Sequence, residues 1–332
     1  MISFRKIAKI TLVLVYLVIV AGAVVRMTGS GMGCPDWPKC FGYYIPPTDV
    51  EQLLWKPQHA YSKGQIIIVE ERLMVATSDF ISTDEYRPSQ WRAYTKHDYA
   101  VFNPVHTWVE YVNRLFGALS GFATLLLAIV SFRFVKTRPL LTVLSVALVF
   151  GMGFQAWLGA TVVYSVLNPV RITLHMLMAL LIVGMLIYLI HKTQEKYTEI
   201  RVGKTAGLLI ITALLLTLVQ VLLGTQVRQW VDRYAVASSN GFVTMDVPVS
   251  FYIHRTLSVL VLIINGYLAW LIAKRKQLTT LIMWVTIVLV LTTFSGVSMY
   301  YFDFPFGMQS LHLVAASVIF GLQYYLVLRT KR

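Results

Sequence analysis

The sequence predicts an all-α integral membrane protein whose eight helices each cross the bilayer. Of its 332 residues, 57% are hydrophobic and only 13% are charged, whereas soluble domains carry about 25% charged residues. Apolar stretches long enough to cross a bilayer core of about 30 Å recur along the chain. These stretches are too long and too continuous for barrel strands, and lipid offers no partners to unpaired backbone groups, so helices are expected.

Short polar segments separate seven of the predicted spans, and one long polar segment follows the first. The eight spans are expected at residues 10–25, 106–132, 140–159, 171–190, 205–227, 249–273, 278–300 and 308–328. The long segment, residues 27–104, is too polar to cross a membrane and is expected to form a small folded loop or cap. Within it, residues 65–70 have the composition of a β-strand.

The placement of the basic residues predicts the orientation of the chain. The formal net charge is +14, and short basic clusters fall at residues 5–9, 133–138, 192–204, 274–276 and 329–332. All five lie on one side if the spans alternate, and the positive-inside rule makes that side cytoplasmic. We therefore expect a multi-pass protein of a bacterial inner membrane, with both termini inside and residues 27–104 outside. Clusters that flank spans indicate contact with lipid and do not indicate nucleic-acid binding.

Matched landmarks indicate that the chain is an internal repeat of two four-helix bundles. An arginine follows a glycine by four residues at the end of the first and of the fifth predicted helix. A histidine follows a glycine at the same spacing in each half. The matched landmarks are Gly22-to-Arg26 with Gly224-to-Arg228, Asn113-Arg114 with His254-Arg255, and Gly159-to-His175 with Gly296-to-His312. We expect the two halves at residues 1–200 and 201–332, with binding sites at corresponding depths.

Two histidines of the second half point to a haem. His254 and His312 are each predicted a few residues inside the outer end of a helix. A polar imidazole is costly in a membrane, so its presence there needs an explanation. One reason is an ordinary hydrogen bond between helices. The other is axial ligation of one iron by both rings, with Arg228 and Arg255 near enough to pair with haem propionates. Zinc is disfavoured, because no carboxylate or thiolate accompanies the pair.

The first half offers a less complete set of ligands. His175 matches His312, but Asn113 stands where His254 would be expected, and an amide is a poor haem ligand. His106, Glu110 and Asn113 share one helix face, so His106 is the alternative second ligand. This asymmetry suits one haem held permanently in the second half, and a substrate haem with an open or loosely filled axial position beside His175 in the first.

Charged and thiol groups near this site have two interpretations each. Glu110 is the only carboxylate inside the predicted spans. It is expected either to transfer protons as a catalytic residue or to form a salt bridge with Arg114.

Cys34 and Cys40 lie in the long polar segment, where an oxidising compartment favours a disulfide. A reactive pair that exchanges electrons is the alternative.

The residues resemble the haem A synthase family over nearly the whole chain. The resemblance rests on Arg26-Met27-Thr28-Gly29-Ser30-Gly31, Cys34-Pro35-Asp36-Trp37-Pro38, Glu110-Tyr111 with Asn113-Arg114, Gly159-Ala160-Thr161-Val162-Val163, His175, His254-Arg255 and His312. It implies haem b on His254 and His312, and a substrate haem beside Glu110. It also implies oxidation of the C8 methyl group of haem O to a formyl group, which makes haem A for cytochrome oxidase.

Partners follow from the same resemblance. It implies haem O as substrate, haem O synthase as its source, an electron acceptor whose identity the sequence does not reveal, and a possible homo-oligomer. We expect Arg26 and Arg114, with Asn113, to contact the substrate and its propionates.

The chain departs from the family pattern at one motif and one loop. The family's Glu-x-x-His-Arg is Glu-x-x-Asn-Arg at residues 110–114, and the segment 27–104 is unusually long.

Two other functions explain the histidine pair: a di-haem b-type membrane electron carrier, and a haem-handling protein of oxidase assembly.

Overall fold

The structure, a computed structural model, describes residues 2–194, 200–239, 246–274 and 279–331. Within these ranges eight helices are long and apolar enough to cross a membrane, which confirms the predicted fold class. They are α1 Ile2–Met27, α2 Pro104–Ser131, α3 Pro139–Tyr164, α4 Pro169–Lys192, α5 Lys204–Ser239, α6 Val249–Lys274, α7 Thr279–Tyr301 and α8 Met308–Arg329. The chain is a multi-pass membrane protein.

Local sequence sets where the first helices begin. Pro104, Pro139 and Pro169 each occupy the first turn of a helix, where a missing N–H costs nothing. The side chains of Asn103 and Asn168 cap α2 and α4 by accepting hydrogen bonds from backbone N–H groups of the first turn. Such caps satisfy donors that a helix end leaves unpaired.

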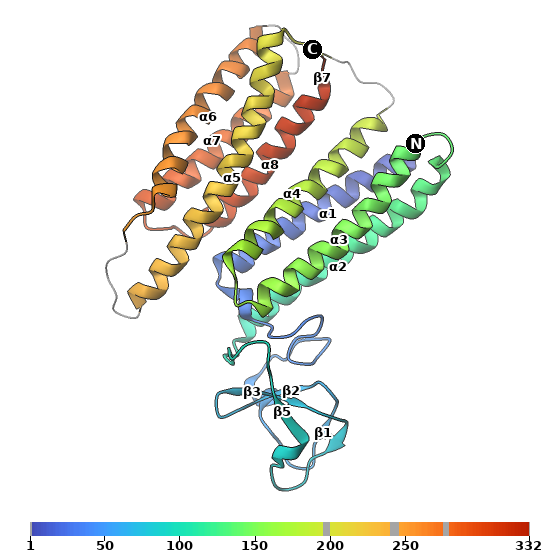
Figure 1. Cartoon of the computed structure of the whole chain (residues 1–332), viewed down its shortest axis with the longest axis vertical. Coiled ribbons are helices and arrows are strands. Elements are labelled where there is room, and N and C mark those ends of the chain that lie inside the picture. The colour runs from blue at the N-terminus through green and yellow to red at the C-terminus, as the bar shows by residue number, and fades with distance from the viewer. Residues whose placement is uncertain (1, 195–199, 240–245, 275–278, 332) are drawn as a thin grey trace.

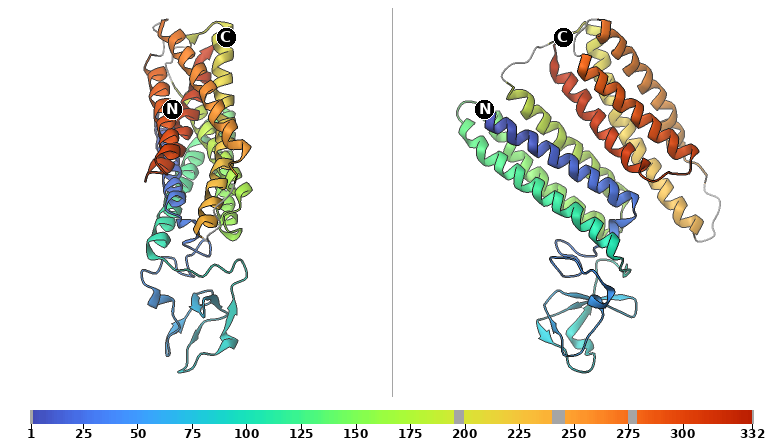
Figure 2. Two further views of the ribbon diagram at one scale, coloured as in Figure 1. Left: turned by 90° about the vertical axis from the view of Figure 1, so that its left-hand side faces the viewer. Right: turned by 180° about the vertical axis from the view of Figure 1, so that it is seen from behind.

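The helices pack as two four-helix bundles (Figures 1 and 2). In the first, each of α1 to α4 contacts two neighbours in a closed ring; α5 to α8 form the second ring in the same order. Helix α8 contacts α1 and α4, and α5 contacts α4, which joins the bundles. A core that includes Phe4, Leu148 and Leu186 of the first bundle continues into Val221 and Phe320 of the second.

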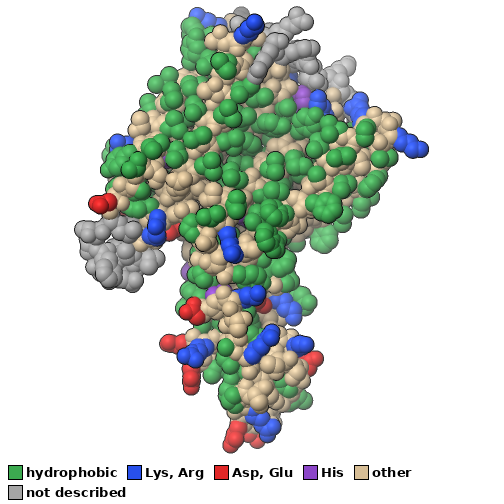
Figure 3. All heavy atoms as spheres, in the orientation of Figure 1, with side chains coloured by type: hydrophobic (Ala, Val, Ile, Leu, Met, Phe, Trp, Pro, Cys, Tyr) green, Lys and Arg blue, Asp and Glu red, His purple; other side chains and the backbone are tan. Residues whose placement is uncertain are grey.

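Large apolar side chains also cover the outside of the helices. Phe122, Phe150 and Ile263 are 71%, 75% and 62% exposed. In Figure 3 the hydrophobic side chains cover the helical part of the face shown, whereas charged groups gather on the strand-rich part and at the opposite end. Such a surface is stable only against lipid.

The segment between α1 and α2 forms a small β domain at one end of the first bundle (Figure 1). It contains three short 3-10 turns, η1 Ser30–Met32, η2 Val50–Leu53 and η3 Pro88–Gln90, and five strands, β1 Ala60–Tyr61, β2 Ile66–Val69, β3 Arg72–Ala76, β4 Phe80–Ile81 and β5 Trp91–Ala93. Strands β2, β3 and β5 form an antiparallel sheet, and β1 pairs with β4. The predicted strand at 65–70 is confirmed as β2. Ile66, Ile67 and Trp91 are buried in the cores of the domain.

Both termini lie at the end opposite to the β domain (Figure 1). There β6 Ile200–Arg201 pairs in parallel with β7 Thr330–Lys331, and a 3-10 turn, η4 Phe132–Phe134, follows α2. The predicted basic clusters belong to this end; their members at 195–199, 275, 276 and 332 lie outside the described residues.

Candidate functional site

The second bundle brings two imidazole rings close together in its interior, at a steep angle to one another. His254 on α6 and His312 on α8 have ring centres 6.3 Å apart. Two imidazoles bound to opposite sides of one metal, each through a bond of about 2 Å, have ring centres roughly 6 Å apart. The two rings are therefore spaced to share one metal atom.

Hydrogen bonds define which nitrogen of His312 is available. Its Nδ1 lies 2.9 Å from the carbonyl oxygen of Thr292 and 3.1 Å from Oγ of Ser295. A carbonyl only accepts, so Nδ1 carries the proton and donates it, which leaves the lone pair of Nε2 for a metal. A ring nitrogen tied to a backbone carbonyl is the usual arrangement behind a metal-bound histidine.

Glycines make room for these rings. A Cβ atom at Gly224 would lie 3.4 Å from Cε1 of His254, and one at Gly296 would lie 3.1 Å from Cε1 of His312. In addition, the backbone carbonyl of His254 accepts a hydrogen bond of 3.0 Å from Nε2 of Gln220. Gln220 and Gly224 are one turn apart on α5, so one face of α5 fixes both the backbone and the ring of His254.

The first bundle repeats these contacts around His175. The carbonyl of His175 accepts a 3.0 Å hydrogen bond from Nε2 of Gln155, and a Cβ at Gly159 would lie 3.4 Å from Cε1 of His175. Asn113 also lies opposite a glycine, as His175, His254 and His312 do, because a Cβ at Gly22 would lie 3.8 Å from Oδ1 of Asn113. Reasoning from the sequence did not identify these two glutamines, although a signal was there: Gln155 precedes Gly159, and Gln220 precedes Gly224, by four residues.

Several polar atoms at these positions are buried without a partner among the described residues. They are Nδ1 of His175, Nδ1 of His254 and Oδ1 of Asn113. A buried polar atom without a hydrogen bond is costly, so each unpaired group calls for an explanation. A polar-edged ligand between the helices would supply one. The donor set of the second bundle, two imidazoles close together, fits a haem iron.

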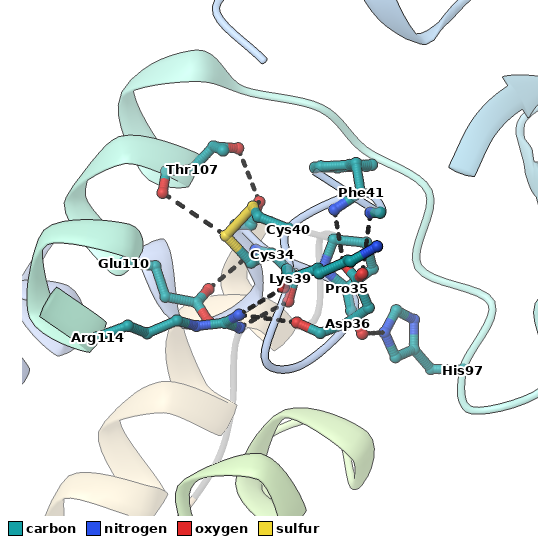
Figure 4. Close-up of a disulfide and its surroundings, with 12 residues drawn as sticks. Cys34, Pro35, Asp36, Lys39, Cys40, Phe41, His97, Thr107, Glu110 and Arg114 are labelled. Carbon is teal, nitrogen blue, oxygen red and sulfur yellow. Dashed lines mark hydrogen bonds and ion pairs between the residues drawn. A yellow bond between two sulfur atoms is a disulfide. The ribbon is translucent and has the colours of Figure 1, made fainter. Parts of the chain in front are cut away.

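Glu110 belongs to a different cluster, at the junction of α2 with the β domain (Figure 4). Its Oε2 accepts a 3.0 Å hydrogen bond from the backbone N–H of Cys34, and its Oε1 lies 2.6 Å from Nη2 of Arg114. Only 4% of Glu110 is exposed. Cys34 and Cys40 form a disulfide. The expected salt bridge to Arg114 is therefore present, and it lies directly below the disulfide loop.

Arg114 is a support of that loop. Its Nη1 donates to the carbonyls of Asp36 and Lys39 at 2.8 Å each, and its Nη2 donates to the carbonyl of Cys34 at 3.3 Å as well as to Glu110. Both terminal nitrogens of the guanidinium are thus engaged by the protein. The geometry favours this supporting role over the expected contact with a propionate.

Asp36 holds the loop from its other side. Its two carboxylate oxygens accept hydrogen bonds from the backbone N–H groups of Phe41 and Gly42, at 2.6 and 2.9 Å. Burial raises the pKa of Asp36, while these two N–H groups and the nearby Arg114 act in the opposite direction. The hydroxyl of Tyr94 and Nε2 of His97 both donate to the carbonyl of Pro35. The conformation of residues 34–42 is therefore fixed by side chains as well as by the disulfide.

The remaining predicted arginines lie at the same end of the bundles. Arg26 on α1 and Arg228 on α5 both form ion pairs with Asp232, so one carboxylate that sequence reasoning missed links the two bundles. Arg255 lies over the rings of Phe251 and Tyr252.

His106 lies in the first turn of α2. Its backbone N–H is capped by Asn103, and its carbonyl is so close to Gly33 that a Cβ there would lie 2.5 Å from the oxygen.

The fold and this site define a class: multi-pass membrane proteins built of two helical bundles, with a pair of histidines inside one bundle, a single histidine inside the other, and a disulfide loop over one bundle end. The chain belongs to the COX15-CtaA family of cytochrome oxidase assembly proteins, whose model matches residues 5–324.

Curated relatives share one name, "Heme A synthase". The protein from Shewanella oneidensis is 27% identical over 188 residues, 57% of this chain and 45% of that protein. The one from Geobacillus thermodenitrificans is 37% identical over 68 residues, 20% of this chain and 22% of that protein. The one from the Wolbachia of Brugia malayi is 23% identical over 340 residues, 93% of this chain and 91% of that protein. The first two matches therefore span less than half of their relatives.

Proposed function

We propose that this protein is a haem A synthase, an oxidoreductase that converts the C8 methyl group of haem O to a formyl group. The observation that carries the proposal is the 6.3 Å spacing of the His254 and His312 rings, together with a separate histidine, His175, in the other bundle. Relatives that share the name and the family match support it. The product, haem A, would serve cytochrome oxidase.

The second bundle would hold haem b as a permanent cofactor. His254 and His312 would hold its iron, and Arg228 and Arg255 would lie near its propionates. When bound, this haem would supply one-electron transfer. The tautomer of His312, fixed by Thr292, keeps the ring oriented for ligation.

The first bundle would bind haem O, with His175 on its iron. Asn113 faces the same interior but offers only an amide, which is a weak ligand. One strong bond in place of two would let the substrate enter and the product leave.

Oxidation of the methyl group to a formyl group takes its oxygen from water and gives four electrons to the acceptor, and Glu110 would accept in turn the protons that are released. Its bonds to Cys34 and Arg114 hold the carboxylate in place at the end of the bundle. Arg26 lies in the last turn of α1, at the end of the first bundle next to the β domain, and it would help to position a propionate.

The proposed orientation puts the β domain on the outer side of a bacterial cell membrane and both termini in the cytoplasm. The supporting observation is that the termini and the basic clusters of the described residues share the end opposite to the β domain, as the positive-inside rule requires.

Expression with a source of haem O tests the proposal. Haem extracted from the membranes is separated and weighed by mass spectrometry, with the His175→Ala variant as control. We expect the formyl product with the native chain and unchanged haem O with the variant. Bound haem b with no formyl product from either chain would contradict the proposal and would identify an electron carrier. Bound haem O without oxidation, and without haem b, would identify a haem-handling assembly protein.

A further inference from the structure

The β domain carries a cluster of exposed apolar side chains on one edge. Tyr44, Ile45, Val50 and Leu54 are 76%, 69%, 47% and 45% exposed; we call these four residues the interfacial edge. Between the first and second pairs, Pro46 and Pro47 are buried. Because proline fixes its backbone angle φ, the adjoining Tyr44 and Ile45 are presented on a stiff segment.

Hydrogen bonds hold the segment just before this edge beside the first turns of α2. Arg114 lies ten residues beyond Pro104, about 15 Å along the helix axis, and it donates to the carbonyls of Asp36 and Lys39. The ammonium group of Lys39 in turn lies 4.7 Å from the centre of the Tyr44 ring. The chain from Lys39 to Tyr44 is therefore held beside the end of the helix and does not project away from it.

A cleft of about 560 Å³ lies between the next residues and α2, and it extends to His59 and Ala60 of the β domain. Its lining includes Ile45, Pro46 and Pro47 from the edge segment and Trp108 from α2. Trp108 belongs to the membrane-spanning stretch that begins at Pro104. Val105, in the first turn of α2, is 66% exposed, so the apolar outer surface of α2 already begins in this turn.

The chemistry of the edge matches the boundary between lipid and water. Tyrosine gathers at that boundary, because its ring is apolar and its hydroxyl is polar. Lysine beside it buries its methylene groups and keeps its ammonium among the headgroups. Tyr44 with Lys39 provides this combination, and Ile45 and Leu54 provide apolar contact. The edge is thus continuous, in position and in chemistry, with the lipid-facing surface of α2.

We propose that the headgroup region of the bilayer covers the interfacial edge, so that the β domain lies against the membrane surface beside α2. The occupant is phospholipid. Contact with lipid at this edge would fix the tilt of the domain over the end of the first bundle, and it would do so whatever reaction the helices carry out.

A matched pair of labelled variants tests this proposal. Ile45→Cys and Ile81→Cys each receive an environment-sensitive fluorophore on the new thiol, in full-length protein reconstituted into phosphatidylcholine vesicles. Ile81 is the control because it has the same side chain and is 70% exposed. It pairs with Ala60, and strand β1, which contains Ala60, lies farther from the helices than β2 and β3 (Figure 1). Leu54→Cys is a second reporter on the edge.

We expect nitroxide lipids to quench the labels at 45 and 54 several-fold more strongly than the label at 81, and aqueous iodide to show the reverse order. Equal quenching by iodide at 45, 54 and 81, with no effect of nitroxide lipid, would overturn the proposal. So would labels at 45 and 54 that are open to iodide in pure vesicles but shielded in native membranes, because a protein partner would then cover the edge.

Discussion

The carboxylate of Glu110 accepts a hydrogen bond from the backbone N–H of Cys34, with 3.0 Å between Oε2 and N. The acid in the second helix and the disulfide loop are therefore one structural unit, joined further by Arg114. A residue proposed to move protons therefore also holds the disulfide loop in place. Substitutions there should change both the reaction and the loop, and the two effects can be measured separately.

Glu110→Gln should lower haem A formation at least tenfold and also expose the disulfide. The amide has the size of the carboxylate but no charge, and it weakens the bond to Arg114. Hydrogen bonds to charged groups contribute about 1.5–3 kcal/mol, so the loop at 34–40 should open more often. The rate at which a mild reductant cleaves Cys34–Cys40, followed by thiol labelling, measures this opening.

Glu71→Gln is the control for that experiment, because Glu71 is an exposed residue in the turn between β2 and β3. It should change neither haem A formation nor the rate of reduction. If Glu110→Gln lost activity while its disulfide stayed as resistant to reduction as in the native chain, the structural half of this prediction would be wrong.

His254→Ala and His312→Ala should each remove the low-spin haem b spectrum while the protein still inserts into the membrane. One ligand cannot hold a six-coordinate low-spin iron, and the rings are spaced for two. His175→Ala should keep that spectrum, since His175 belongs to the other bundle. His59→Ala, in the β domain, serves as a control with no expected effect. An unchanged spectrum in both His254→Ala and His312→Ala would remove the basis for the haem b assignment.

The helices could be predicted closely from the sequence because lipid imposes one simple requirement, a long apolar stretch. The largest difference is at the end of α5, which was expected at residue 227 and continues to Ser239. That extension contains Asp232, which pairs with Arg26 and Arg228. Hydropathy could not predict it, because the added turns are polar and lie beyond the apolar stretch.

The site was predictable where a side chain has one chemical use, and less so where partners come from distant segments. Two membrane histidines at similar depth indicated the pair at His254 and His312. Arg114 was expected either to pair with a propionate, as guanidinium groups do, or to form a salt bridge with Glu110. The structure shows the salt bridge and also directs Arg114 to carbonyls of residues 34–39. Contacts across some eighty residues depend on how the loop folds, which no local pattern encodes.

Asn265→Leu should destabilise the second bundle, and adding Gln323→Leu should restore most of the loss. Nε2 of Gln323 donates to Oδ1 of Asn265 at 3.1 Å, and both residues are almost fully buried, at 2% and 4% exposure. Removing one partner leaves an amide unpaired in an apolar bundle, at a cost of about 1–3 kcal/mol, whereas removing both is nearly neutral. Thermal unfolding in detergent of the native chain, both single variants and the double variant measures this coupling. Additive losses would show that the two amides do not depend on one another.

We expect Asn113 to set how firmly the first bundle holds the haem proposed for it. Asn113 lies opposite Gly22 as His254 lies opposite Gly224, so Asn113→His should place a second imidazole toward the ligand of His175. A second strong bond should retain haem in this bundle through purification and slow turnover, because the product must leave. Asn113→Ala loses no iron bond and should be milder than His175→Ala, which should abolish conversion of haem O. Haem content per chain and haem A yield measure the two effects together.

His106→Ala completes the series: a nearly silent result leaves His175 as the sole iron ligand from the protein in this bundle. A loss as severe as that of His175→Ala would instead make His106 the second ligand, and the weak-partner account of substrate release would be wrong.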